Sequence, residues 1–252
     1  MHTLRQDSRE WLEADGSGGF ASGTVDGIRT RRYHGLLLVA TEPPTGRMVL
    51  VNGFDAWIDL DSVRVPLSSQ RYAPGVVYPD GASRLLSFLH EPWPTWRYTP
   101  DDGSTVVQEV FAVQDPAATV ISWRIEGASR PAKLTVRPLL SGRDYHALHH
   151  ENASFRFDSL IRDTAVIWSP YEGVPAIRSV SDGAYRHDPL WYRNFEYAEE
   201  RDRGLDDLED LASPGELSWW LVDGRPAIWV LTTDTSTAVP TTQHGIADAV
   251  RT

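Results

Sequence analysis

Short runs in which apolar and polar residues alternate, separated by turn signals, account for most of this chain. The Asp-Asp-Gly sequence at residues 101–103 is typical of a hairpin turn, and three alternating runs follow it between residues 105 and 139. In the middle run, Ile121 and Trp123 fall on one face of a strand and Arg124 falls on the other. We therefore predict an antiparallel sheet with one solvated face.

Further segments of strand-like length and composition lie on both sides of these runs. They are residues 35–40, 47–52, 55–60, 63–67, 85–90, 95–99, 154–157, 164–168, 176–180, 217–222 and 227–233. Helical signals are limited to a short helix around residues 195–203 and one turn at 208–211, and a turn follows at 213–215. Because a parallel α/β fold needs long helical segments between its strands, we predict an all-β fold.

The predicted architecture is a large two-sheet antiparallel β-sandwich, a supersandwich, with one or two short helices. Residues 1–234 would form this domain. Residues 235–252 lose the strand periodicity and are predicted to be a tail or linker.

Composition narrows the classes of function. The 252 residues carry a formal net charge of -11, whereas nucleic-acid-binding domains are usually basic. We therefore expect no nucleic-acid partner. The absence of cysteine excludes disulfides and thiol chemistry. Without a signal-peptide core or a long apolar run, we expect a soluble, cytoplasmic protein with no membrane partner. The 10 Trp and 9 Tyr suit sugar-stacking surfaces or the core of a β fold, and composition does not separate these interpretations.

The stretch from residue 11 to residue 40 combines a turn, a polar cluster and a strand. Residues 15–19 (Asp-Gly-Ser-Gly-Gly) predict a sharp turn, and residues 35–40 predict a buried strand. The polar cluster before this strand contains Arg31, Arg32, Tyr33 and His34. No phosphate-loop motif occurs, and a β-like run follows the glycines. The loop either presents these side chains to a sugar, a carboxylate or another domain, or it is a hairpin turn with solvated arginines.

A second dense stretch begins with Trp191, Tyr192 and Arg193. If residues 195–203 are helical, Glu196 and Glu200 lie on one face at i, i+4. Two such carboxylates suit the acid and base of glycoside hydrolysis, an interdomain or substrate contact, or a solvated helix.

A third stretch contains His146 and His150 at the spacing of a helical metal site. Ala147 occupies the position where a zincin has glutamate, so a polar loop at a sheet edge, with Arg143 paired to Asp144, is the favoured interpretation. The residues alone therefore predict no metal, no cofactor and no complete catalytic apparatus.

These three stretches together resemble the N-terminal domain of bacterial and archaeal glycogen debranching enzymes of the amylo-α-1,6-glucosidase type. The residues that carry the resemblance are EWL at 10–12, Gly16, GGFASGT at 18–24, TRRYHGLL at 30–37, RDYHAL at 143–148, WYRN at 191–194, Tyr197, Glu200-Arg201, Arg203-Gly204-Leu205, Glu209-Asp210-Leu211 and Ser213-Pro214-Gly215. Asp15 stands where the family often has asparagine, which preserves the turn.

The resemblance implies a β-sandwich joined to a C-terminal (α/α)6 barrel that carries the glycosidic acid and base. Because the sequence ends where the sandwich ends, we expect a debranching-enzyme fragment or a stand-alone homologue without these carboxylates. The implied substrate of the full-length enzyme is the α-1,6-linked glucose stub of glycogen or limit dextrin.

We therefore hypothesise a non-catalytic domain that braces the barrel and helps to shape the glucan groove. The residues expected at the interface with the barrel or the glucan are Arg31, Arg32, Tyr33, His34, Asp144, His146, Trp191, Tyr192, Arg193, Glu196 and Glu200. This hypothesis requires residues 31–34 and 191–200 to meet at a shared rim. The alternatives are a stand-alone carbohydrate-binding module for α-glucans and a self-sufficient glycosidase that uses Glu196 and Glu200.

Overall fold

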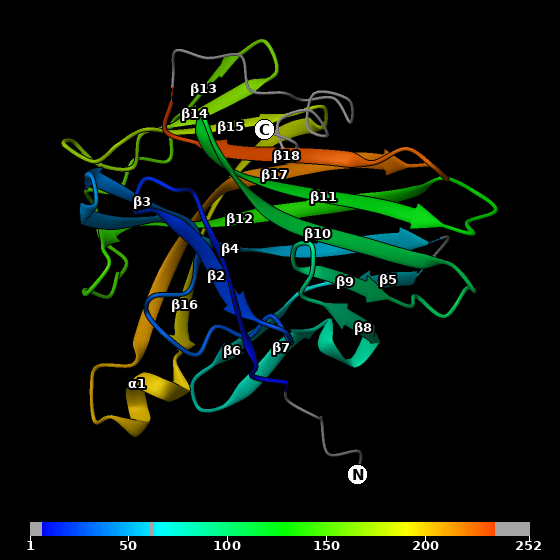
Figure 1. Cartoon of the computed structure of the whole chain (residues 1–252), viewed down its shortest axis with the longest axis horizontal. Coiled ribbons are helices and arrows are strands. Elements are labelled where there is room, and N and C mark those ends of the chain that lie inside the picture. The colour runs from blue at the N-terminus through cyan, green and yellow to red at the C-terminus, as the bar shows by residue number, and fades with distance from the viewer. Residues whose placement is uncertain (1–6, 61–62, 235–252) are drawn as a thin grey trace.

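The computed structural model describes residues 7–60 and 63–234, which form two antiparallel β-sheets packed against each other (Figure 1). The larger sheet has the spatial order β1 (Glu10–Ala14), β2 (Phe20–Thr24), β3 (Gly35–Glu42), β4 (Thr45–Leu60), β12 (Ala132–Asp144), β17 (Leu208–Leu221), β16 (Ala184–Glu196), β6 (Ser69–Tyr72) and β7 (Val76–Asp80), with β5 (Val63–Pro66) paired to β4.

The smaller sheet has the order β13 (Ser159–Arg162), β14 (Ala165–Trp168), β15 (Ile177–Ser181), β18 (Ala227–Thr232), β11 (Ala117–Glu126), β10 (Thr105–Gln114), β9 (Thr95–Tyr98) and β8 (Leu85–Leu89). The described helices are the 3-10 turn η1 (Ala82–Arg84) and α1 (Ala198–Asp202). The predicted all-β sandwich is confirmed. No described helix is long and apolar enough to cross a membrane. The predicted tail, residues 235–252, lies outside the described residues.

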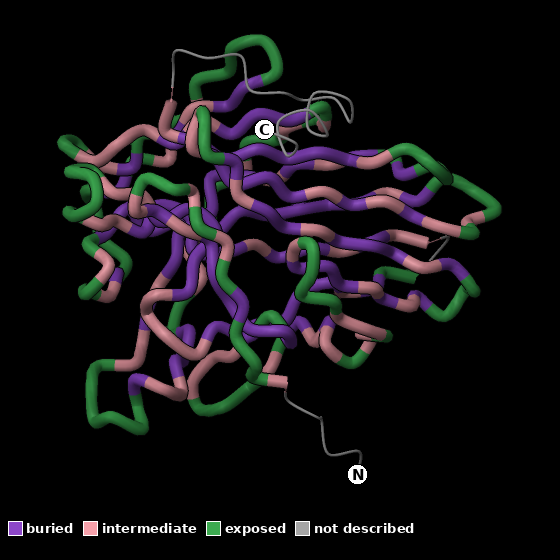
Figure 2. The backbone as a smooth tube through the Cα atoms, viewed as in Figure 1, coloured by how far each residue is buried: buried purple, intermediate pink, exposed green. Residues whose placement is uncertain are grey.

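The main core lies between the sheets, as the buried middle of the strands in Figure 2 indicates. Ile121 and Trp123 of β11 face inward there, which confirms the predicted alternation of this strand. Trp123 packs edge-on against Phe54 of β4, with ring centroids 5.4 Å apart, and its Nε1 donates to Gln108 at 2.9 Å. Large aromatic side chains thus join the two sheets across the core.

The prediction of one solvated face is wrong for parts of both sheets. The third run belongs to β12 in the larger sheet, and its outward residue Arg137 is buried between Asp188 and Glu216. In the smaller sheet, Phe111 and Val113 of β10 lie in a second apolar cluster that does not belong to the main core. Alternation therefore predicted the strands correctly but not what covers their outer faces.

Three local predictions also differ from the structure. Residues 47–60 were expected as two strands broken at Gly53, but β4 continues through this position. A Cβ at Gly53 would lie only 2.5 Å from Nη1 of Arg29, so the glycine admits a close approach rather than a turn. Residues 154–157 form no strand.

The predicted helix at 195–203 shrinks to α1, and residues 208–215 are part of β17 rather than a helical turn and a loop. Strand β17 pairs with β12 on one side and β16 on the other, and this pairing outweighs the local helical signal. Pro214, which cannot donate a ladder hydrogen bond, lies where the pairing to both neighbours shifts register.

Candidate functional site

The loop before β3 and the segment around α1 meet at one end of the larger sheet, although they lie far apart in the sequence. The backbone N–H of Arg32 donates to Glu200 Oε1 at 3.1 Å, and the Arg32 guanidinium lies 3.2 Å from Glu200 Oε2. Close by, Glu199 N–H donates to the carbonyl oxygen of Thr30 at 3.0 Å. The loop at residues 31–34 therefore meets the end of the segment 191–200, at Glu199 and Glu200, as the shared rim requires. We use "the rim" for Glu10, residues 30–34, residues 144–146 and residues 196–206.

Arg32 holds three parts of the rim together. Its Nη1 donates to the carbonyl oxygen of His146 at 2.6 Å, and its Nη2 donates to that of Asp206 at 3.1 Å. Because Glu200 is buried at 1% exposure and Arg32 is mostly buried, this ion pair is shielded from solvent. Arg32 therefore acts inside the rim rather than on its surface.

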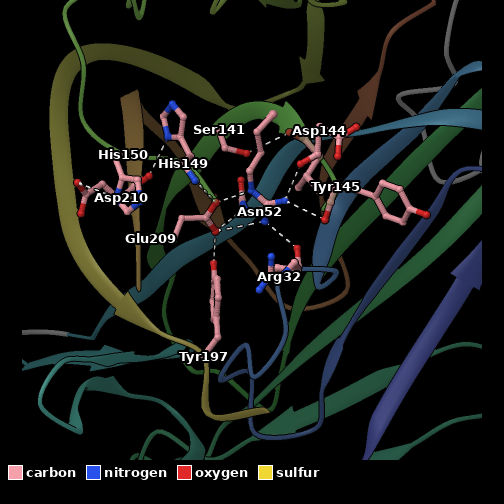
Figure 3. A network of polar contacts seen from close by, with 12 residues as sticks. Arg32, Asn52, Ser141, Asp144, Tyr145, His149, His150, Tyr197, Glu209 and Asp210 are labelled. Atoms are coloured by element: carbon pink, nitrogen blue, oxygen red, sulfur yellow. Dashed lines mark hydrogen bonds and ion pairs between the residues drawn. The ribbon is translucent and has the colours of Figure 1, made fainter. Parts of the chain in front are cut away.

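A second network beneath the rim has the fully buried Glu209 of β17 at its centre (Figure 3). Glu209 accepts hydrogen bonds from Arg143 Nε and from the Tyr197 hydroxyl. It also accepts from Asn52 Nδ2 at 3.2 Å and from His149 N–H at 3.0 Å. A buried carboxylate with a paired guanidinium and several further donors is well compensated for its loss of hydration.

The two networks are joined through Arg143. Its Nη2 donates to the carbonyl oxygen of Arg32 at 2.6 Å, so the loop before β3 is tied to β12 and β17. Burial lowers the pKa of Arg143, but the adjacent Glu209 more than offsets this and keeps the pKa above its ordinary value. Burial also raises the pKa of Tyr197, so its hydroxyl keeps its proton and donates to Glu209.

The predicted pairing of Arg143 with Asp144 is wrong. Asp144 instead accepts a hydrogen bond from the backbone N–H of His146 at 2.8 Å, which closes a local turn. Sequence reasoning gave Glu209 no role, because its neighbours suggested a helical turn. The signal that could have identified it is a single acidic residue at an inward position of a strand, since such a residue needs a buried partner.

The outer part of the rim is a row of partly exposed ion pairs. Arg31 Nε lies 2.5 Å from Glu10 Oε1, and Arg31 Nη2 lies 3.3 Å from Glu199 Oε2. Glu10 and Glu199 are 44% and 43% exposed, so both remain accessible to a partner. Charges held in fixed positions yet accessible suit a polar interface.

His34 lies beneath this row and is neutral at physiological pH. Burial is the main cause that lowers its pKa, to about 4, with Arg31 and Arg29 adding to the effect and Glu10 opposing it. Nδ1 accepts the backbone N–H of Thr30 at 3.2 Å, so the ring proton resides on Nε2, which lies 3.4 Å from Glu10 Oε1.

Tyr33, Tyr145 and His146 form an aromatic corner of the rim. The hydroxyl of Tyr33 lies 3.1 Å from Nδ1 of His146, and the rings of Tyr145 and His146 have centroids 3.9 Å apart. Residues 145–147 form a turn rather than a helix, so the H-x-x-x-H spacing does not place His146 and His150 on one helical face. Within the described chain, no group of three or more His, Asp or Glu side chains suits a metal ion.

Glu196 and Glu200 do not form the side-by-side pair that a helix would give. Glu196 ends β16, where its carboxylate lies 2.9 Å from Arg201 Nη1 and accepts the backbone N–H of Gly75 at 3.0 Å. Both glutamates are buried, and each is paired with an arginine. This arrangement stabilises the rim and offers no open pair of carboxylates for acid and base catalysis.

The remaining predicted residues lie further along β16. Trp191 is half-buried and stacks on His149, with ring centroids 5.4 Å apart, whereas Tyr192 packs against a separate small core. Burial raises the pKa of Tyr192 to about 12. Arg193 is exposed and paired with Glu151. Each of these three residues therefore has a different partner, and none takes part in the rim contacts around Arg32.

Two solved structures show a distant likeness to this chain. A putative kojibiose phosphorylase from the human microbiome is 8% identical with a TM-score of 0.31, over 82% of this chain and 26% of that one. A bacterial glucoamylase complexed with acarbose is 10% identical with a TM-score of 0.38, over 97% of this chain and 33% of that one. This chain thus spans a third or less of either protein, and similarity at these TM-scores carries no argument about function.

A search of curated proteins returned no significant match. Residues 9–228, in contrast, match the family model described as glycogen debranching enzyme N terminal. This match contains both segments that meet at the rim and extends over most of the described chain. The protein therefore belongs to the family of glycogen debranching enzyme N-terminal domains.

Proposed function

We propose that this chain is the non-catalytic N-terminal domain of a glycogen debranching enzyme, and that its rim braces a glucosidase domain of the same polypeptide. The proposed catalytic domain carries the acid and base that hydrolyse α-1,6-glucosidic branch stubs. The rim covers one side of that domain and shapes the wall of its glucan-binding groove. The family match supports the enzyme context, and the geometry of the rim supports the bracing role.

The observation that carries the bracing role is the contrast between the inner and outer layers of the rim. Glu200 is buried and accepts the backbone N–H of Arg32, and the mostly buried Arg32 guanidinium lies 3.2 Å from its carboxylate, so the two segments are joined. Glu10 and Glu199 remain accessible on that fixed backbone. Polar groups held in place before binding lose little conformational entropy when a partner docks.

The rim also contains an exposed apolar side chain. Leu205, in the loop after α1, is 50% exposed, and the neighbouring Asp206 is also exposed. An apolar side chain surrounded by accessible charges has the composition of an interface anchor with a polar rim. The preformed site therefore contains both elements that a domain contact needs.

The test is association of this chain with the proposed catalytic domain, expressed separately. We expect Arg31→Ala and Leu205→Ser each to weaken the complex about tenfold, because both lie on the accessible layer. Arg64→Ala is the matched control, since Arg64 forms a similar exposed ion pair with Asp59 on β4 and β5, away from the rim. Isothermal titration calorimetry provides the affinities.

Two results would overturn the bracing role. The first is an open reading frame that does not continue into a catalytic domain. The second is an unaltered affinity in both rim variants while Arg64→Ala behaves like the unmodified chain.

A further inference from the structure

The outer face of β17 ends on an exposed tryptophan. Successive residues of this strand alternate, so Trp219 and Leu221 face the core while Ser218 and Trp220 face outward. Trp220 is 69% exposed, and the only other aromatic side chain of comparable exposure in the described range is Tyr78 at 70%. Most of the tryptophan side chains that were expected to suit either a core or a sugar surface lie in the core, and Trp220 is the clear exception.

Trp220 lines a surface groove of about 300 Å³ together with Asp182, Ser218 and Arg225. The volume lies at the lower end of the range found for small-molecule sites. The groove therefore combines a flat apolar ring with a carboxylate, a hydroxyl and a guanidinium.

The wall of this groove is rigid. Asp182 Oδ1 accepts Nε1 of the buried Trp219 at 2.7 Å and the backbone N–H of Ile228 at 3.2 Å. These bonds orient the Asp182 carboxylate, and no described residue donates to its second oxygen. Arg225 also lines the groove, is exposed, and forms no ion pair with a described residue. Both polar side chains are thus available to a ligand.

We propose that this groove binds a chain segment of an α-glucan, with Trp220 stacked on the apolar face of a glucose ring. Asp182 accepts hydrogen bonds from sugar hydroxyls, and Arg225 donates to hydroxyl or ring oxygens. A neutral pyranose, which has an apolar face and hydroxyls at its edge, matches this combination. The identification of the sugar as an α-glucan rests on the proposed function.

The groove is separate from the rim. Trp220 lies eleven residues along β17 from Glu209, the centre of the network beneath the rim. At about 3.3 Å per residue, this part of the strand spans at most about 36 Å. One domain contact at the rim therefore leaves the groove free. Because a branched polymer presents many chains, a second contact to the same particle raises the effective concentration of substrate at the catalytic domain.

The test is affinity electrophoresis of the whole 252-residue chain in gels that contain glycogen, with soluble maltoheptaose as competitor. We expect the unmodified chain to be retarded and Trp220→Ala to bind at least about tenfold more weakly. Arg225→Gln should weaken binding by a smaller factor. Tyr78→Ala is the matched control, because it removes an equally exposed aromatic ring from β7.

Retardation that is equal in the unmodified chain and in Trp220→Ala would overturn the proposal, as would no retardation of the unmodified chain. Self-association that is lost in Trp220→Ala without any glycogen binding, measured by sedimentation velocity, would instead assign the groove to contact between copies of the chain. Trp220→Ala should associate normally with the catalytic domain. Glycogen retardation therefore tests the groove, and association with the catalytic domain tests the bracing role.

Discussion

Arg143 and Arg29 are both buried arginines, with 6% and 7% exposure, but their surroundings differ. The guanidinium of Arg143 pairs with Glu209 and donates to backbone carbonyl oxygens, including that of Arg32. Arg29 stacks on Phe195, with its guanidinium carbon 4.9 Å from the ring centroid. Its Nε and Nη2 have no hydrogen-bond partner among the described residues.

The surroundings of Arg29 form a cavity of about 70 Å³ between the sheets, lined also by Asn52 and Gln70. With Arg29, Asn52 and Gln70 in its wall, a cavity of this size has room for several water molecules, at about 10–15 Å³ for each. The nearby Asp55 is fully buried, and burial raises its pKa to about 6 against the opposing effects of Gln70 and Arg29. The positive charge of Arg29 is therefore compensated by Asp55 at a distance, whereas the charge of Arg143 is compensated by direct contact with Glu209.

The contrast between the two arginines indicates where this domain is rigid. A guanidinium with a direct carboxylate partner and several carbonyl acceptors fixes the segments that supply them. The network of Arg143 joins β12, β17 and the loop before β3 directly beneath the rim. The cavity around Arg29 does not fix the surrounding segments in a comparable way.

Removing the partner of Arg143 should have the largest effect. Glu209→Gln leaves the Arg143 charge buried without a counter-ion, and we expect a loss of about 4 kcal/mol in the free energy of unfolding. Urea denaturation monitored by circular dichroism provides the value. A loss of unfolding free energy below about 1 kcal/mol would show that Glu209 does not compensate the charge of Arg143.

His34 gives a third way to bury a basic group, which is to remain neutral. Its pKa of about 4 lies below the unfolded value, so its contribution to stability is present above pH 6.5 and is lost as the pH falls toward 4. Between pH 7 and pH 5, His34→Gln should gain about 2 kcal/mol relative to the unmodified protein. Urea titrations at both pH values measure this difference. Parallel pH profiles would contradict a neutral His34.

Asp55 acts in the opposite direction, because its raised pKa adds stability as the pH falls from about 6 toward 3.8. The His34 effect is therefore measured as a difference between two proteins that both retain Asp55.

Arg29→Met should have the smallest effect. Methionine keeps apolar contact with Phe195, and the variant loses the cation–ring contact and the distant attraction to Asp55, so we expect a loss of about 1 kcal/mol at pH 8. Near pH 5, where Asp55 is mostly protonated, the loss should be smaller. A loss as large as that of Glu209→Gln at either pH would remove the contrast between the two arginines.

Residue patterns predicted the fold class because each strand carries its own local signal. The alternation around Trp123, the hairpin turn at 101–103 and the apolar run at 35–40 appear in the structure as parts of β11, the β9–β10 connection and β3. The patterns failed where local preference and sheet pairing disagree, as in residues 208–215, because the neighbours that pair with a strand are not visible in its own sequence.

Sequence alone determined that the chain is an all-β sandwich, which family it resembles, and that residues 31–34 and 191–200 are unusually rich in charged and aromatic side chains. Which charges pair is visible only in the folded chain: Arg143 binds Glu209 rather than its neighbour Asp144, and Arg32 binds Glu200 from 168 residues away. The physical reason is that any arginine attracts any carboxylate, so burial and backbone position, rather than sequence spacing, select the partner.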